Sequence, residues 1–435
     1  MSAIFDDASL QSKLEERLIR YAGVWTTSDK RCEDTPTTAG QWDLARLLEK
    51  ELRALGLQDI ELTEHCYLIA RLPSTVKESA HAAALPVIGF LSHLDTSAEV
   101  SGKDVHPIVE RNYDGRIIEL ADGVTLDPAE DAELAAQKGR ALIHTDGGTL
   151  LGADDKAGIA EIVSAAEYFS AHPEIEHPAL EFIFSPDEET GKGLPCFPQH
   201  KIHARYCYTL DGGGAPEIEA ECFNAYSVDV YFSGKVIHPG AARGVLVNAA
   251  LMAATFAAML PRSESPEATD GYYGYYCLME LSGNQESAHA ELIVRDFSRE
   301  GMERRLGAIE AFARAVEAEF PGGTARVEAK LSYINMKEKI DGEPAVLEKL
   351  FAAGSALGLE LKLKPIRGGT DGARLSELGI PTPNIWTGGR RFHSKTEWVS
   401  LDDMVLAVKL VVELAHLWVP QALSALDDGV RSQTA

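Results

Sequence analysis

The chain has 435 residues, 45% of them hydrophobic and 25% charged, and its 41 basic and 67 acidic residues give a net charge of −26. This length predicts two domains, and the composition is that of a globular protein without a biased tract. The acidic balance argues against a nucleic-acid partner, and the lack of an apolar run of about 18 residues argues against a membrane span.

Two features bear on where the protein works. The N-terminal stretch MSAIFDDASLQSKLEERL is acidic and polar, without the basic and apolar regions of a signal peptide, so we expect a cytoplasmic protein. The six cysteines are scattered and include no CxxC pair. This arrangement favours buried free thiols over a disulfide framework or a thiolate zinc site.

The segments up to Gly212 alternate between helical and extended patterns. Thr38-Ala-Gly-Gln41 reads as a capping box, followed by leucines at helical spacing and by Gly56 where a helix would end. Three short apolar runs predict buried strands, and a helical stripe at residues 159–169 lies between the first two of them; the runs are residues 87–91, 180–184 and 206–210. This alternation predicts an α/β domain with a mixed, mostly parallel sheet and helices on both faces.

The pattern changes after Gly212-Gly-Gly214. Alternating strands and amphipathic helices then predict an inserted α+β domain with an antiparallel sheet; the strands are residues 225–232, 291–297 and 325–334, and the helices 248–256 and 303–319. From Glu343 the earlier pattern returns, with a helix, a strand at 383–386 and a last helix at 401–418. We expect a catalytic domain in two parts, 1–219 and 336–435, interrupted by a lid or dimerisation-like domain at 220–335.

Four motifs place a His, Asp or Glu just beyond the carboxyl end of a predicted strand. They are LSHLD at 91–95, SPDEE at 185–189, TLDG at 209–212 and GRRFH at 389–393. In open α/β sheets this edge is where ligands bind, so residues about 300 positions apart can meet there. A group of carboxylates alone would repel itself, whereas a divalent cation removes the repulsion. Nitrogen and oxygen ligands without thiolate suit zinc, cobalt or manganese.

The stretch LLGADDKAG at 150–158 adds two adjacent carboxylates, Asp154 and Asp155. One carboxylate can bridge two metal ions held about 3.5–4 Å apart, the usual spacing of two-metal hydrolytic sites. We expect Asp154 to be the bridge, because Asp155 opens a helix and can act as its N-terminal acid. We expect the neighbouring Lys156 to form an ion pair on the helix surface.

In order and spacing, LSHLDT, LLGADDKAG, SPDEETGKG, TLDGG, HPG and FHS resemble the motifs of the co-catalytic dizinc peptidases, a family that includes carboxypeptidase G and the aminoacylases. IRGGTDGARLSELGIPTPNIWTGG and HPGAARGVLVNAA resemble its tripeptide aminopeptidase subgroup. The resemblance runs over nearly the whole chain. It implies two Zn²⁺ per subunit, with Co²⁺ or Mn²⁺ as alternatives, and a short peptide substrate. Whether the chain forms a homodimer stays open.

The resemblance also implies roles for residues at matching positions. His93 and Asp211 would complete the first zinc site, Glu189 and His393 the second, and Asp154 would bridge them. Asp95 would orient His93, and Glu188 would be the general base that takes a proton from the attacking water. A cis peptide bond between Asp154 and Asp155 is implied as well.

Further expectations concern the inserted domain, which would close as a lid over the substrate. His238 of IHPG resembles the lid histidine of the family. Arg295 and Arg367 are candidates to bind the C-terminal carboxylate of the peptide, and Asn248 is a candidate substrate contact. The acidic, alanine-rich stretch at 121–138 is expected to touch none of these motifs.

Two other functions compete with a tripeptide aminopeptidase. One is a dizinc carboxypeptidase or a deacylase of N-acyl amino acids with the same fold. The other, from a different class, is a metal-dependent binding or scaffolding protein without turnover. Loss of Glu188 would mark the latter, and Glu188 is present.

Overall fold

The computed structural model describes residues 5–77 and 79–420, and the chain divides into two compact units. The first unit contains the residues up to Glu219, Lys339–Lys364 and the residues from Thr370 onward, and the second contains Ala220–Glu338 and Pro365–Gly369. The predicted domain borders at 219/220 and 335/336 stay a proposal. Contacts between residues define the two units, whereas a domain is also expected to fold by itself.

The first unit is built on an eight-stranded sheet in the order β1-β2-β8-β3-β9-β16-β10-β15. The neighbours β8, β3, β9 and β16 run parallel, as do β10 and β15, whereas the β1, β2 and β8 pairs and the β16–β10 pair are antiparallel. This confirms the predicted mixed, mostly parallel sheet. The strands are β1 Gln58–Leu62, β2 Leu68–Leu72, β3 Ile88–His93, β8 Leu180–Ser185, β9 Tyr206–Gly212, β10 Glu217–Glu219, β15 Lys362–Leu363 and β16 Asn384–Trp386.

Both faces of the central strands are buried. Successive side chains of a strand point to opposite sides, so neighbouring residues of one strand enter two different cores. Phe90 and Phe182 belong to the large core that also contains the apolar faces of the long helices. Leu91 and Ile183, one position further along, pack instead with Leu375 of the helix on the other face. The continuous apolar runs in the sequence therefore correspond to strands covered on both sides.

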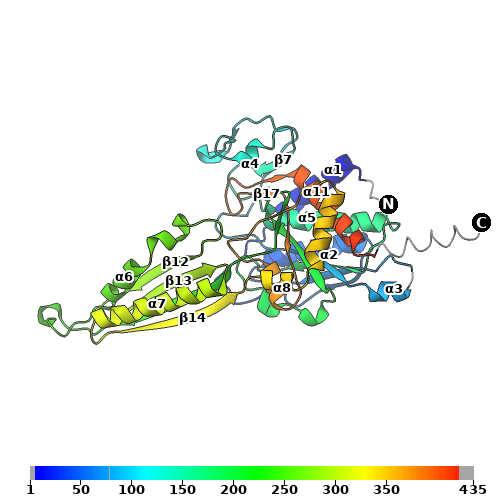
Figure 1. Ribbon diagram of the computed structural model, residues 1–435. Helices are drawn as coiled ribbons and strands as arrows, with labels where there is room; N and C mark the ends of the chain where they lie inside the picture. The colour runs from blue at the N-terminus through cyan, green and yellow to red at the C-terminus, as the bar shows by residue number, and fades with distance from the viewer. Residues whose placement is uncertain (1–4, 78, 421–435) are drawn as a thin grey trace, which may run out of the picture. The chain divides into compact units, whose positions relative to one another are not determined.

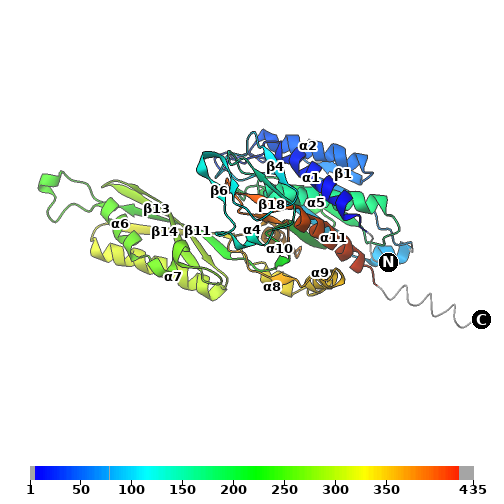
Figure 2. The ribbon, with the colours of Figure 1, turned by 90° about the horizontal axis from the view of Figure 1, so that it is seen from above.

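Helices α1, α5 and α11 pack side by side on one face of this sheet (Figure 2). Their sequences carry apolar residues at helical spacing, and α5 is almost wholly buried. The last helix and the α5 stripe were predicted, whereas α1 was not. The helices of the unit are α1 Asp7–Ala22, α2 Ala39–Ala54, α3 Ser79–Ala84, α4 Ala132–Ala135, α5 Ala153–Ala171, α9 Ala345–Ala356, α10 Asp371–Glu377 and α11 Leu401–Leu417, with α8 Lys337–Asp341 at the border of the two units.

Helix α2 begins and ends where the sequence indicated, but its predicted capping box does not form. Thr38 is the N-cap residue, yet its side chain accepts no capping hydrogen bond. The amide of Gln41 donates to Asp187 Oδ1 at 2.7 Å and to Thr38 Oγ1 at 3.2 Å instead of reaching back to the backbone. A tertiary partner has therefore replaced the local one. Gly56 follows the helix with a φ of 85°, in the left-handed region that favours glycine.

A smaller antiparallel sheet in the first unit has the order β17-β18-β7-β4. The segment between β4 and β7 contains a short antiparallel pair of strands, β5 and β6. The strands of the smaller sheet come from both parts of the unit, because β17 and β18 follow the inserted segment and β4 and β7 precede it. This sheet holds the turn that carries His393. The strands are β4 Pro107–Glu110, β5 Ile118–Glu119, β6 Thr125–Leu126, β7 Leu142–Thr145, β17 Gly389–Arg390 and β18 Trp398–Ser400.

The second unit is a four-stranded antiparallel sheet, β12-β13-β11-β14, with α6 and α7 packed against it (Figure 1). This confirms the predicted α+β composition with an antiparallel sheet. Strand β12 was not predicted, because as an edge strand it carries exposed apolar side chains such as Met279 without a regular alternation. The elements are β11 Asn224–Ser233, β12 Tyr275–Gly283, β13 Ser287–Asp296, β14 Thr324–Tyr333, α6 Ala249–Met259 and α7 Arg299–Glu319.

Two compositional predictions can be compared with the structure. The six cysteines all lie within the described residues and form no disulfide bond, and Cys66, Cys207 and Cys222 are buried, as expected of thiols that serve as small apolar side chains. Within residues 5–77 and 79–420, no helix combines the length and the apolar character needed to cross a lipid bilayer.

Candidate metal centre

The five predicted metal ligands come together in the first unit, at the carboxyl edge of the large sheet. His93 is the last residue of β3, and Asp211 lies at the end of the parallel neighbour β9. Glu189 follows β8, the neighbour on the other side of β3. Asp154 lies in the first turn of α5, and His393 in the turn between β17 and β18. Adjacent parallel strands end at the same edge, which explains why residues distant in sequence meet here.

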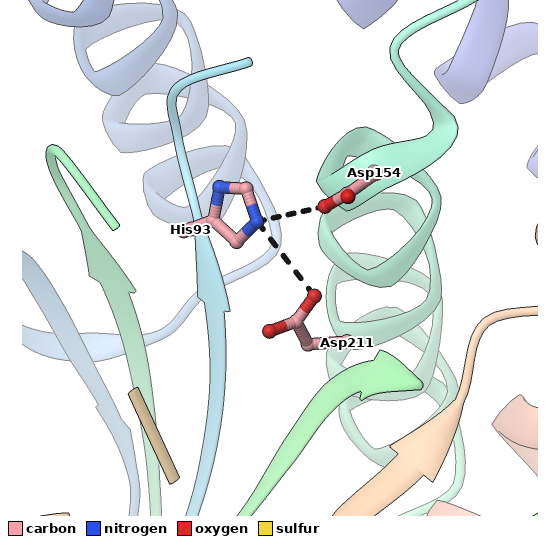
Figure 3. A group of neighbouring side chains, drawn as sticks. All are labelled: His93, Asp154 and Asp211. Atoms are coloured by element: carbon pink, nitrogen blue, oxygen red, sulfur yellow. Dashed lines mark hydrogen bonds and ion pairs between the residues drawn. The ribbon is translucent and has the colours of Figure 1, made fainter. Parts of the chain in front are cut away.

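The first group of possible ligands is His93, Asp154 and Asp211 (Figure 3). The Nε2 atom of His93 lies 2.9 Å from Asp154 Oδ1 and 3.7 Å from Asp211 Oδ1. The imidazole and the two carboxylates point toward one another from β3, α5 and β9 (Figure 3). One nitrogen and two oxygens thus face a common centre.

The second group is Asp154, Glu189 and His393. The Nε2 atom of His393 lies 3.2 Å from Asp154 Oδ2 and 3.0 Å from Glu189 Oε1. Within each group the ligand atoms all lie within 4.8 Å of one another. Asp154 is the member common to both groups, and it turns Oδ1 to His93 and Oδ2 to His393. This is the arrangement that a carboxylate bridging two cations requires.

Two glycines allow α5 to bring Asp154 to this position. Gly158 lies so close to the end of β9 that a Cβ atom would come within 1.9 Å of the carbonyl oxygen of Leu210, so only glycine permits the approach. Gly152, the N-cap residue, has a φ of 76° in the left-handed region. The peptide bond between Asp154 and Asp155 is cis, as the family resemblance implied. The spacing of LLGADDKAG therefore follows from close packing as well as from chemistry.

Asp95 has a wider role than the sequence suggested. The Nδ1 atom of His93 lies 3.0 Å from the backbone oxygen of Asp95 and 3.3 Å from its carboxylate. The same carboxylate accepts the backbone N–H groups of Glu188, at 3.0 Å, and Glu189, at 3.2 Å. Asp95 is fully buried. It therefore ties the loop after β3, which follows His93, to the loop after β8, which holds Glu188 and Glu189.

Asp155, which we expected to serve as the N-terminal acid of α5, also supports His93. Its Oδ2 atom accepts the backbone N–H of His93 at 3.0 Å. Burial raises the pKa of Asp155 well above its usual value, and repulsion from Asp211 adds to the effect. Neighbouring aspartates thus face different partners: Asp154 faces the two imidazoles and Asp155 the backbone of β3.

The electrostatics of the cluster favour positive charge at its centre. Burial opposes protonation of His93, but contacts with Asp154 and Asp211 raise the pKa of this histidine well above its usual value. Contacts with Asp154 and Glu189 raise the pKa of His393 to about 11. Although burial acts the other way, the two imidazoles lower the pKa of Asp154. A bound cation would take the place of these protons on the histidine nitrogens.

The adjacent carboxylates of Glu188 and Glu189 have raised pKa values. Burial raises the pKa of Glu188 well above its usual value, with repulsion from Asp211 as a further cause. Burial and repulsion from Asp154 raise the pKa of Glu189 to about 8. The Oε1 atom of Glu189 is buried, and it faces His393 Nε2, another proposed ligand of the second cation, at 3.0 Å. Two imidazole nitrogens with carboxylate oxygens and no thiolate suit zinc, cobalt or manganese, so the residues fit the predicted cofactor.

The four predicted substrate-binding residues lie in the second unit. Arg367 donates hydrogen bonds to the backbone oxygens of Gly271, Tyr273 and Thr269, so its guanidinium already holds a loop of this unit. Asn248 caps α6 through bonds from Ala250 N and Leu251 N. His238 is exposed and accepts the N–H of Gly240, and Arg295 donates to the backbone oxygens of Tyr226 and Val294. Their roles toward a substrate stay predictions.

Two further expectations, both about residues near the metal centre, were wrong. Lys156 does not form a surface ion pair: it is buried and donates to the backbone oxygen of Val24 at 2.7 Å, and burial lowers its pKa to about 7. The acidic stretch at 121–138 does touch the motifs, because Asp131 Oδ2 accepts a hydrogen bond of 2.8 Å from Arg391 Nε, two residues before His393. Neither contact has a local signature, since each joins segments more than 130 residues apart.

Sequence reasoning also missed Glu397, whose buried carboxylate accepts the backbone N–H of Asp154. The available signal was a single acidic residue four positions after His393, in SKTEW, just before a strand. Such a residue is ordinary on a surface, and only the fold shows that it is buried.

Comparison with known proteins gives consistent results. Residues 128–417 match the model of the peptidase family M20/M25/M40. The chain is 43% identical over 406 residues to peptidase T of Clostridium perfringens, covering 93% of this chain and 99% of that protein. Among solved structures, it is similar to aminopeptidase PepT from Bacillus cereus, with a TM-score of 0.73 and 24% identity over 94% of this chain and 99% of the other. A tripeptidase from Staphylococcus aureus gives a TM-score of 0.74 and 20% identity with the same coverage.

Proposed function

The chain belongs to the peptidase family M20/M25/M40, and from this membership we propose that it is a metal-dependent tripeptide aminopeptidase. It would release the N-terminal residue of a tripeptide by hydrolysis. The observation that carries the proposal is the geometry of Asp154, which offers one carboxylate oxygen to each of two histidine-containing groups. The 43% identity to a peptidase T over nearly the full length supports the choice of substrate class.

Two zinc ions are the proposed cofactor, with Co²⁺ or Mn²⁺ as alternatives. His93, Asp211 and Asp154 would hold the first ion, and Asp154, Glu189 and His393 the second. When bound, the ions supply Lewis acidity, which lowers the pKa of a water molecule and polarises a peptide carbonyl. The mixed nitrogen and oxygen donors support this assignment over a thiol-preferring metal.

Glu188 is the proposed general base and acid. It lies next to the ligand Glu189 in sequence, and Asp95 holds the backbone N–H groups of both residues. Glu188 would take the proton from the attacking water and deliver it to the nitrogen of the departing peptide. The adjacent glutamates thus divide the work, because Glu189 binds metal while Glu188 moves the proton.

His238, Asn248, Arg295 and Arg367 remain the proposed substrate-binding residues. His238 is proposed from the family resemblance, and the two arginines because a guanidinium can bind the C-terminal carboxylate of a peptide through two hydrogen bonds. Arg367, Arg295 and Asn248 already form hydrogen bonds within their own unit, and these bonds would have to be released before the same groups could bind a substrate. His238, which is exposed, is the better candidate. A raised KM with an unchanged kcat in His238→Ala would indicate that this residue contributes to binding alone.

The proposal is tested with a peptide panel on metal-free and metal-loaded protein. The zinc-loaded chain should release the N-terminal residue from a free tripeptide such as trialanine, and a chelator should abolish the reaction. N-acetyl-trialanine should not be cleaved, because an aminopeptidase requires the free amine. Hydrolysis of N-acetyl amino acids with no action on trialanine would instead support the deacylase of the same fold.

A binding protein without turnover is the remaining alternative. Such a protein would bind two metal ions and would hydrolyse none of these compounds, whichever metal ion is bound. Metal analysis of the purified chain, followed by reconstitution with Zn²⁺, Co²⁺ and Mn²⁺ separately, distinguishes this outcome from an enzyme assayed with the wrong ion.

A further inference from the structure

Glu397 is a buried glutamate that the mechanism above does not use. Only 1% of its surface is exposed. Its Oε2 atom accepts the backbone N–H groups of Leu151, at 2.7 Å, and Gly152, at 2.9 Å, and its Oε1 atom accepts that of Asp154, at 3.1 Å. One side chain thus accepts three hydrogen bonds from a segment about 245 residues away in sequence.

The three contacts satisfy backbone N–H groups that lack partners at the start of α5. The first N–H groups of a helix have no partner within the helix, and an N-cap side chain usually provides one. Here the N-cap residue is Gly152, which has no side chain to do so. Asp154 is the second residue of the helix, so its N–H also lacks a partner within the helix. Glu397 supplies the missing acceptors from another part of the chain.

The position of Glu397 gives this cap a second consequence. It lies four residues after His393, between the turn that holds this ligand and strand β18. Strand β18 is paired with β7, with Trp398 opposite His144 and Val399 opposite Ile143, so the residue after Glu397 is fixed in a sheet. The carboxylate of Glu397 therefore connects the backbone of the bridging ligand to the segment that carries His393.

We propose that Glu397 is a positioning residue of the second metal site, where it holds the bridging carboxylate of Asp154 at a set distance from His393. This inference rests on the proposed function, because it assigns Asp154 and His393 to one cation. Two of the three proposed ligands of that cation lie on segments that Glu397 joins. The third, Glu189, is held separately through its own backbone N–H by Asp95.

A glutamine at this position tests the role. In Glu397→Gln an amide NH₂ replaces one oxygen and faces backbone N–H groups, so two donors oppose each other. In Glu397→Asp the charge stays, but the shorter side chain cannot reach all three N–H groups. Metal-free full-length protein is titrated with Co²⁺, and the affinity of each equivalent and the visible absorption spectrum are recorded.

The matched control is Glu181→Gln. Glu181 is also a fully buried glutamate that accepts backbone N–H groups, those of His203 and Ala204, and it accepts a further hydrogen bond from Arg71 Nε. It lies in β8, which itself contains no proposed ligand. Both glutamine variants should lose thermal stability. Only the Glu397 variants should weaken binding of the second equivalent, by about 10–100-fold, with a changed Co²⁺ spectrum.

A Glu397→Gln chain that binds both equivalents with the wild-type affinities and spectrum would overturn the inference and leave Glu397 as a helix cap alone. If Glu397→Gln does not fold, hydrogen exchange of the wild-type chain decides. The second equivalent should slow exchange of the Leu151, Gly152 and Asp154 amides, and unchanged exchange would overturn the role. A wild-type chain that binds no second equivalent would instead overturn the proposed function itself.

Discussion

The carboxylate of Asp95 accepts the backbone N–H of Glu188 through Oδ1 at 3.0 Å. Its other oxygen accepts the N–H of Glu189, so Asp95 holds the proposed base and a proposed ligand together, in addition to its contact with His93. The fold thus uses one buried acid to set three groups of the site. Such supporting carboxylates orient a metal site as much as the ligands themselves do.

Replacing Asp95 by asparagine should therefore damage metal binding as well as catalysis. The side-chain amide of the Asp95→Asn variant would turn a donor toward one of two backbone N–H groups, and we expect metal affinity to fall by about 10–100-fold. Asp402→Asn is the control, because Asp402 also accepts a backbone N–H, that of Ala141, and is not among the proposed site residues. Equal metal affinity in the two variants, measured by titration, would contradict the supporting role of Asp95.

Glu188→Gln should separate proton transfer from metal binding. We expect kcat to fall by about 10²–10⁴-fold, the usual contribution of a general base, because the amide cannot take a proton from water. Two metal equivalents should still bind, since Glu188 is not a proposed ligand. Steady-state kinetics on a tripeptide together with metal analysis gives both results. Full activity in Glu188→Ala would remove Glu188 from the mechanism.

Asp131 should support the turn that carries His393. Its Oδ2 atom accepts Arg391 Nε at 2.8 Å, while Oδ1 caps α4 through the N–H of Leu134 at 3.0 Å. Arg391 and His393 both have a positive φ, a conformation that external contacts must maintain in residues other than glycine.

Asp131→Ala should lower the affinity for the second cation several-fold and reduce stability by about 1 kcal/mol, because alanine can neither hold Arg391 nor cap α4. Asp127→Ala is the control, because Asp127 lies in the same acidic stretch and its side chain accepts the N–H of Ala129. Calorimetric titration with zinc measures the affinity. Lower stability in Asp131→Ala with unchanged binding of both cations would show that the stretch only caps α4.

A pH-dependent effect on stability is expected from Glu161 in the middle of α5. This residue is fully buried, both of its carboxyl oxygens receive no hydrogen bond, and burial raises its pKa well above the usual value. The folded state therefore binds the Glu161 proton more tightly than the unfolded state, so this group destabilises the fold increasingly as pH rises above about 4.3. Glu161→Met should raise the free energy of unfolding by about 1–3 kcal/mol at neutral pH, and by less at pH 4.

Glu167 of the same helix provides the control with the opposite sign. Burial raises the pKa of Glu167, but hydrogen bonds from Lys13 and Arg17 outweigh it and lower the pKa overall. Glu167→Gln should therefore destabilise the chain at neutral pH, and the loss should fade below about pH 4 as the wild-type carboxylate becomes protonated. Thermal unfolding from about pH 3 to pH 8 tests both variants. A Glu161→Met effect that does not change with pH would contradict the assigned protonation.

The central elements of the fold could be predicted because their signals are local. The run VIGFL predicts a strand buried on both faces, and Ile159 to Phe169 form an unbroken helical stripe. Edge strand β12 was not predicted, since it exposes apolar side chains without a regular alternation. Helix α1 does carry a periodic signal, with Leu10, Leu14 and Leu18 buried at helical spacing, and this signal was overlooked beside the acidic start of the chain.

The ligand residues could be named because each stands in a recognisable motif, four of them at or just beyond the end of a strand and Asp154 at the start of a helix, and the structure brings all five together. Of the residues that support them, Asp95 was named through the family resemblance, whereas those with distant partners could not be named. Glu397 and Asp131 are single acidic residues in polar stretches, and their contacts depend on backbone groups and side chains that only tertiary folding brings near. The predicted capping box failed for the same reason, since the side-chain amide of Gln41 donates to the distant Asp187.

The most direct test is the metal-loaded crystal structure, with anomalous diffraction recorded at the zinc edge. We expect two zinc peaks in each chain, one beside His93 and Asp211 and one beside Glu189 and His393, with Asp154 contributing a separate oxygen to each. A single peak, or two peaks of which Asp154 contacts only one, would contradict this expectation.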